Sequence, residues 1–346
     1  MLGSFRLILA LFVVNSHLFS PWYPGAYAVI SFYIISGYLM TLIMNKRYGY
    51  FRNGVKLFLL NRFLRIYPPY YVAVLFSLLL ISFIPREFID IFDTTLGFPD
   101  TVSSIIKNIV ILGLEKNEPI LLVPIAWSIH VELFYYIMIA LFLGRSKKVA
   151  HIWLGLSVAY LFTLLIIEKS SFYYRYATIP AASLPFCVGA YLFHYSDKIS
   201  LLLRKITWQL GIKLSIGLYC IPFLLPPLFR DDYKWLNTTA IPFYLNVFTT
   251  AILIWYLMNT PKDKFTVFRK WDSWFGDLSY PVYLFHWHSG ILVAYLFGFA
   301  KSSTTLLVFG GGLTLFLAVL EVKFLSNSLE NMRNKIKASV KEKVFR

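Results

Sequence analysis

Long stretches without a charged residue constrain this chain more than any other feature. No Asp, Glu, Lys or Arg occurs between Leu7 and Asn45, and similar runs recur along the whole sequence. A helix needs about 20 apolar residues to cross a bilayer core, where its backbone amides must bond within the segment. Only 14% of the residues are charged, against about 25% in a typical soluble domain. The sequence therefore predicts an all-α, polytopic membrane protein and excludes a soluble enzyme, a secreted disulfide scaffold and a nucleic-acid-binding protein.

The apolar runs predict about ten membrane-spanning helices. The first run is too long for one span, and Pro21, Pro24 and Gly25 divide it in two. The run from 119 to 144 is interrupted only by Glu132. The remaining predicted spans lie at about residues 66–85, 149–167, 176–196, 209–229, 235–261, 278–300 and 302–320.

The distribution of basic residues predicts the orientation of these spans. Ten spans place both termini on one side, and most of the 33 Lys and Arg residues fall in the loops of that side. Because such residues concentrate in cytoplasmic loops, both termini are predicted to be cytoplasmic. The same rule accounts for the net charge of +16 without a nucleic-acid partner. We expect one transmembrane domain over residues 1–325 and a basic cytoplasmic tail over residues 326–346.

Ionisable side chains inside predicted spans mark candidate functional sites, because they are costly in a bilayer. His17 follows Arg6 by eleven residues, and at 100° per residue both side chains point to one face of a helix, roughly 16 Å apart. Arg6 then lies at the cytoplasmic boundary and His17 about halfway across the membrane or further. The structural alternatives are a hydrogen-bonded histidine between packed helices and an arginine that only sets topology.

The fourth predicted span contains a carboxylate. Glu132 shares a helix face with Ser128, and it needs a basic partner such as His17 or an arginine from another span. A structural ion pair between helices is the alternative. His286 and His288 are two residues apart and splay on a helix, so we interpret them as packing or interfacial residues. No metal site is predicted.

Two arginines lie where the third predicted span begins. Arg62 and Arg65 are three residues apart and share one face at the cytoplasmic membrane surface. Two guanidinium groups held in this way can bind a phosphate through paired hydrogen bonds. A flank that only sets membrane topology is the alternative.

Five short elements occur in a fixed order along the chain. They are Arg6-x10-His17, Ser31-Phe32-Tyr33-Ile34-Ile35-Ser36-Gly37-Tyr38-Leu39, Arg62-x-x-Arg65-Ile66-Tyr67-Pro68, Trp127-Ser128-x-x-x-Glu132-x-Phe134-Tyr135, and Phe275-Gly276-Asp277-Leu278-Ser279-Tyr280-Pro281-Val282-Tyr283-Leu284-Phe285-His286. Together they resemble the acyltransferase-3 family of integral-membrane acyltransferases, over most of the chain.

The resemblance implies a multi-pass enzyme of the inner (cytoplasmic) membrane, surrounded by lipids. Its expected activity is transfer of an acyl group, usually acetyl, from cytoplasmic acyl-CoA to a hydroxyl of a cell-surface polysaccharide or its lipid-linked oligosaccharide precursor. Acetyl-CoA or another acyl-CoA is then a co-substrate, and no tightly bound cofactor is expected. The implied catalytic residues are His17 and Glu132, and the implied donor-binding residues are Arg6, Arg62, Arg65, Ser36, Gly37, Trp127 and Ser128.

In this interpretation the arginines hold the phosphates of acyl-CoA and the pantetheine arm reaches His17. His17 either deprotonates the acceptor hydroxyl or carries the acyl group itself, and Glu132 orients the imidazole. One alternative is a transporter or flippase of a lipid-linked glycan, with His17 and Glu132 as a proton relay. Another is the unrelated type of membrane-bound O-acyltransferase, in which His286 would be the catalytic candidate. The spacing of Arg6 and His17 favours the first interpretation.

Overall fold

The computed structural model describes residues 1–346 except 20–23, 168–171, 204, 229–240, 262–267 and 345–346. The described residues contain helices and no strands. The helices are α1 (Leu2–Leu18), α2 (Pro24–Ile43), α3 (Arg52–Phe83), α4 (Arg86–Phe92), α5 (Val102–Val110), α6 (Ala126–Met138), α7 (Lys147–Ile166), α8 (Phe172–Tyr176), α9 (Ile179–His194), α10 (Ser196–Leu203), α11 (Trp208–Leu228), α12 (Ile241–Met258), α13 (Phe268–Phe297), α14 (Thr304–Glu321) and α15 (Asn327–Val344). Short π-helical turns follow α2, α6 and α14 at Met44–Tyr48, Ile139–Leu143 and Val322–Ser326. The predicted all-α fold is confirmed.

Seven helices in the described part of the chain are long and apolar enough to cross a membrane. These candidates are Gly25–Tyr48, Arg52–Phe83, Ala126–Leu143, Tyr173–His194, Trp208–Leu225, Ile241–Met258 and Thr304–Ile336. The count of ten is therefore not confirmed. The three other predicted spans coincide with α1, α7 and α13, of which α1 has only 17 residues. The cytoplasmic side of the termini stays a prediction.

Helix α1 runs parallel to α13 and contacts it closely along the whole length of α1. A Cβ added at Gly3 would fall 1.7 Å from the backbone oxygen of Asp272, and one at Gly290 would fall 2.4 Å from the side chain of Leu18. The Asp272 carboxylate accepts hydrogen bonds from the amides of Gly3 (3.2 Å) and Ser4 (2.8 Å). It thus satisfies amides that the first turn of α1 leaves unpaired.

Both helices present faces built from alternating steps of three and four residues, which keep side chains on one side of a helix. On α1 this face holds Gly3, Arg6, Ala10, Val13 and His17, and on α13 it holds Gly276, Ser279, Tyr283, His286 and Gly290. The small residues allow the close approach, so the larger ones on the same faces are held in fixed positions.

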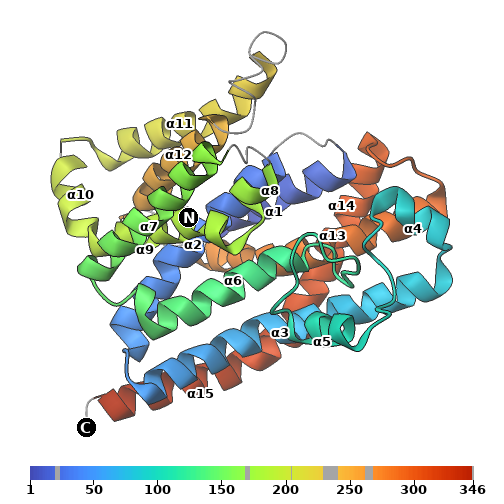
Figure 1. The fold of residues 1–346 in the computed structure, drawn as a ribbon, viewed down its shortest axis with the longest axis horizontal. Helices are drawn as coiled ribbons and strands as arrows, with labels where there is room; N and C mark the ends of the chain where they lie inside the picture. Colours follow the sequence, from blue (N-terminus) through green and yellow to red (C-terminus); the bar gives the residue numbers. More distant parts are fainter. Residues whose placement is uncertain (20–23, 168–171, 204, 229–240, 262–267, 345–346) are drawn as a thin grey trace.

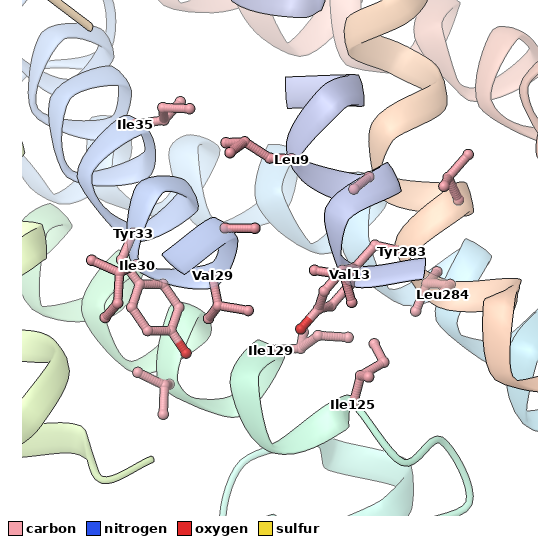
Figure 2. Packing of buried hydrophobic residues seen from close by; sticks show 14 of the residues in the cluster. Leu9, Val13, Val29, Ile30, Tyr33, Ile35, Ile125, Ile129, Tyr283 and Leu284 are labelled. Carbon is pink, nitrogen blue, oxygen red and sulfur yellow. The ribbon is translucent and has the colours of Figure 1, made fainter. Parts of the chain in front are cut away.

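The buried centre of the bundle joins four helices around this pair. Figure 2 shows apolar side chains from α1, α2, the start of α6 and α13 packing together. The labelled residues are Leu9, Val13, Val29, Ile30, Tyr33, Ile35, Ile125, Ile129, Tyr283 and Leu284. Polar side chains that project from these four helices therefore lie close to one another inside the bundle.

The C-terminal segment packs on the bundle. The predicted tail forms α15, which lies along α3 (Figure 1). Asn61 of α3 donates a hydrogen bond to the backbone oxygen of Arg333 (3.3 Å), and Arg333 is 8% exposed. This end of the chain is thus part of the folded domain and adds a buried arginine to it.

Candidate active site

Three arginines line one cavity in the bundle. This arginine cavity, named for Arg6, Arg62 and Arg65, has a volume of about 150 Å³ and lies between α1, α2, α3, α6 and α13. Arg62 is buried, and its Nη2 donates to Asn61 Oδ1 at 2.9 Å, whereas its Nε has no hydrogen-bond partner. A buried guanidinium with a free donor is suited to bind an anionic group.

Glu132 is the acidic side chain in the arginine cavity. Its Oε1 accepts hydrogen bonds from Ser36 Oγ (2.5 Å) and from the Tyr136 hydroxyl. The predicted contact between Glu132 and His17 is not formed, and the hydrogen-bond partner of the His17 ring is a different residue. Glu132 therefore does not contact the imidazole that it was predicted to orient, because the two side chains line different cavities.

His17 lines a second and larger cavity of about 450 Å³, which we call the histidine cavity. Trp127, Tyr176 and Trp287 contribute aromatic walls, and the His17 and Trp287 rings lie 4.9 Å apart. The Lys116 ammonium lies 5.2 Å from the ring centres of both Trp127 and Tyr176. Its partial burial in the loop between α5 and α6 lowers the pKa of Lys116.

The partner of His17 is His286 of α13. His17 Nδ1 and His286 Nε2 are 2.7 Å apart, and His286 Nδ1 lies 2.8 Å from the backbone oxygen of Tyr283. Since a carbonyl only accepts, His286 Nδ1 carries the proton and its Nε2 accepts from His17 Nδ1. This leaves the Nε2 lone pair of a neutral His17 free to take a proton, as a general base requires.

The two cavities adjoin, since Val29 and Tyr283 line both of them. The Tyr283 hydroxyl and Ser128 Oγ are 2.7 Å apart and form a hydrogen bond at this shared wall. A long, slender ligand bound in the arginine cavity therefore has only this wall between its far end and His17.

The structure separates the other predicted donor-binding residues. Ser36 and Ser128 line the arginine cavity, but Trp127 lines the histidine cavity. Gly37 lines neither: a Cβ there would fall 2.2 Å from the backbone oxygen of Phe186 in α9. The prediction for Gly37 is corrected, because its lack of a side chain allows α2 and α9 to touch. Among the described residues no cluster of His, Cys, Asp or Glu is arranged to hold a metal ion.

A family model described as an acyltransferase domain matches residues 2–320. The chain belongs to the acyltransferase-3 family. The match covers nearly the whole chain, so the predicted resemblance is confirmed, and the family supports acyl transfer as the general activity of a multi-pass membrane protein. No curated protein and no solved structure matches the chain. The family match ends before α15.

His286 is the functional residue of this acyltransferase that its neighbour His288 obscured in the sequence. The spacing of two between His286 and His288 indicated that the two do not form a metal-binding pair. The spacing of His286 to other residues of α13 places it on the face that contacts α1. His286 follows Tyr283 by three positions and precedes Gly290 by four, and this face contacts α1. His288 points elsewhere, with its Nε2 2.6 Å from Ser77 Oγ of α3.

Proposed function

We propose that the chain transfers an acyl group, most often acetyl, from cytoplasmic acyl-CoA to a hydroxyl of a cell-surface polysaccharide or its lipid-linked precursor. The observation that carries this proposal is the pair of adjoining cavities, one with three arginines and the other with His17. Acyl-CoA has its phosphates at one end and its thioester at the other, beyond a slender pantetheine arm. Its groups follow the order of the cavities, with the arginine cavity toward the cytoplasm of an inner-membrane enzyme, and the arm reaches His17 when the wall at Val29 and Tyr283 opens.

His17 acts as the general base. The acceptor oxygen attacks the thioester carbon while its proton passes to His17 Nε2, and the carbon–sulfur bond then breaks. The imidazolium returns the proton to the departing thiolate, so acyl ester and free CoA are the products. His286 holds the ring through His17 Nδ1, which keeps Nε2 directed toward the histidine cavity.

The walls of the histidine cavity support a sugar as the acceptor. Its volume of about 450 Å³ falls in the range of small-molecule sites, which combine apolar rings with a few polar groups. Trp127, Tyr176 and Trp287 supply flat apolar faces, and Lys116 and Asp93 supply polar groups at the same cavity. The C–H groups of a sugar ring pack on such faces while its hydroxyls reach the polar groups.

The experiment that tests the proposal is incubation of the purified protein with radiolabelled acetyl-CoA and membrane glycan, with release of CoA as the measurement. We expect CoA release that depends on added glycan, with the label recovered in the glycan as an alkali-labile ester. Glycan movement across vesicles without CoA release would favour the transporter instead. That alternative used His17 and Glu132 as a proton relay, and the two side chains line different cavities.

Glu132→Gln is expected to lower stability more than turnover. The amide oxygen keeps both hydrogen bonds, but the negative charge that offsets three arginines is lost. Uncompensated charge inside a protein costs several kcal/mol. We therefore expect the CoA-free variant to melt several degrees lower, while acetyl transfer per folded molecule falls less than about tenfold. The measurements are thermal unfolding in detergent and the transfer assay.

The matched control for this change is Glu87→Gln, because Glu87 is exposed on α4. It should change neither quantity. A Glu132→Gln protein that melts normally but transfers no acetyl group would contradict the structural role and return Glu132 to the chemistry.

His286→Phe is expected to lower kcat about 100-fold and to leave KM for acetyl-CoA unchanged. The phenyl ring fills the space but offers no acceptor to His17 Nδ1, so the base is no longer held in place, and misplacement of a catalytic group has effects of this size. His286 is a positioning residue in this account. Steady-state kinetics with acetyl-CoA provide the measurement.

His288→Phe is the matched control, because His288 is a buried histidine on the same helix that bonds Ser77 and not His17. It should lower the yield of folded protein while kcat of that protein is kept. Equal loss of kcat in the two variants would show that both histidines only support packing.

A further inference from the structure

A third cavity, of about 60 Å³, adjoins the arginine cavity on the side away from His17. Arg65 and Tyr280 line both of these cavities, whereas the third cavity shares no lining residue with the histidine cavity. Along α13 the three follow one another, with Asp277 in the third cavity, Tyr280 at its boundary with the arginine cavity, and Trp287 in the histidine cavity. The three cavities therefore form a row, with the histidine cavity at one end and the third cavity at the other.

Helix α15 supplies a fourth arginine to this end of the row. Arg333 lines the third cavity with Arg65, and it is 8% exposed. Its Nη1 bonds Glu330 at 2.8 Å, but its buried Nε has no hydrogen-bond partner. Asn61 connects it to Arg62, because the Asn61 side chain donates to the Arg333 carbonyl and accepts from Arg62 Nη2.

Arg333 lies beyond residue 320, where the match to the family ends. We propose that Arg333 and Arg65 form a subsite for the ribose 3′-phosphate of acyl-CoA, so that α15 extends the donor site of this chain. The inference rests on the proposed function, since it takes acyl-CoA as the donor.

The order of groups in the donor agrees with the order of the cavities. In CoA the 3′-phosphate lies beyond the pyrophosphate as seen from the thioester. With the thioester near His17 and the pyrophosphate in the arginine cavity, the 3′-phosphate falls in the third cavity. A guanidinium binds phosphate through charge-assisted hydrogen bonds, which are the stronger kind.

Two carboxylates also line the third cavity, and both differ from Arg333 in exposure. Asp277 is exposed, and the Glu330 side chain is 40% exposed. Because the Glu330 side chain is 40% exposed, water solvates its carboxylate when a phosphate replaces it at Arg333. The two carboxylates balance the positive charge of the two guanidinium groups while the donor is absent.

The test is binding of CoA and of 3′-dephospho-CoA to the full-length protein in detergent, measured by titration calorimetry. We expect the wild-type chain to bind CoA about tenfold more tightly, as one charge-assisted interaction allows. Arg333→Gln should weaken CoA binding about tenfold and change 3′-dephospho-CoA binding less than about twofold. Lys335→Gln, which removes an exposed charge from the same helix, should leave both unchanged.

Equal binding of the two probes by the wild-type chain would overturn the subsite, and so would an equal loss of both in Arg333→Gln. A wild-type chain that binds neither probe would refute acyl-CoA as the donor, and thus the proposed function itself. If Arg333→Gln does not fold, Arg333→Lys keeps the charge without the planar fork of donors. It should show an intermediate loss for CoA alone, and unchanged CoA binding would overturn the proposal.

Discussion

His17→Ala is expected to abolish acyl transfer while expression and membrane insertion stay normal. The imidazole forms a hydrogen bond to His286 through its Nδ1 and contacts the Trp287 ring at the wall of the histidine cavity. Alanine removes the base together with these two contacts, and the rest of the bundle is unchanged. Loss of a general base costs about 100- to 10,000-fold in rate. Glycan acetylation by membranes that contain equal amounts of each protein is the measurement.

His151→Ala is a suitable control for this change, because His151 is an exposed histidine on α7. It should acetylate the glycan at the wild-type rate. If the His17→Ala protein acetylated glycan fully, His17 would not be the base, and His286, the candidate of the unrelated O-acyltransferase type, would become the residue to test.

The sequence was sufficient to predict which side chains of the site lie on the same face of one helix. Arg6 and His17 lie on the same face of α1, as their spacing of eleven required, and each lines a cavity. Arg62 and Arg65 likewise share a face of α3 and meet Arg6 in one cavity. Regular helix geometry fixes such relations, because they do not depend on which helices become neighbours.

Pairings between distant helices could not be predicted in this way. His17 and His286 are 269 positions apart, and only the packing of α1 against α13 brings them together. The same packing leaves Glu132 with Ser36 and Tyr136 in place of the predicted partner His17. A buried carboxylate requires partners, but the sequence does not say which of several helices provides them.

The membrane spans and the C-terminal segment also differ in part from what the sequence predicts. The absence of charged residues predicted a span at 278–300, and α13 covers most of it. His286 and His288 nevertheless lower the mean hydropathy of α13, so it is not among the seven helices that are apolar enough to cross a membrane. The alternating charges of α15 were interpreted as a tail. Arg333 is nevertheless buried, because α15 packs along α3 and Asn61 bonds its backbone.

Removing one arginine from the arginine cavity is expected to weaken CoA binding about 10- to 100-fold, the size of a lost charge-assisted interaction. This applies to Arg6→Gln, Arg62→Gln and Arg65→Gln. Lys46→Ala is the control, since Lys46 is exposed in the π-helical turn after α2, outside the cavity. It should change CoA affinity less than about twofold. Equal and small effects in all four variants would mean that the arginines only set membrane topology.

Thermal stability measured without CoA is a second, independent test of the role of these arginines. Three guanidinium groups around one small cavity repel one another. This repulsion lowers the stability of the folded protein while no anion is bound. Arg65→Gln, which breaks no hydrogen bond described in the structure, should therefore melt at or above the wild-type temperature while it loses CoA affinity. Added CoA should raise the wild-type melting temperature and raise that of Arg65→Gln much less. A variant that melts well below wild type without CoA would instead identify Arg65 as a structural residue.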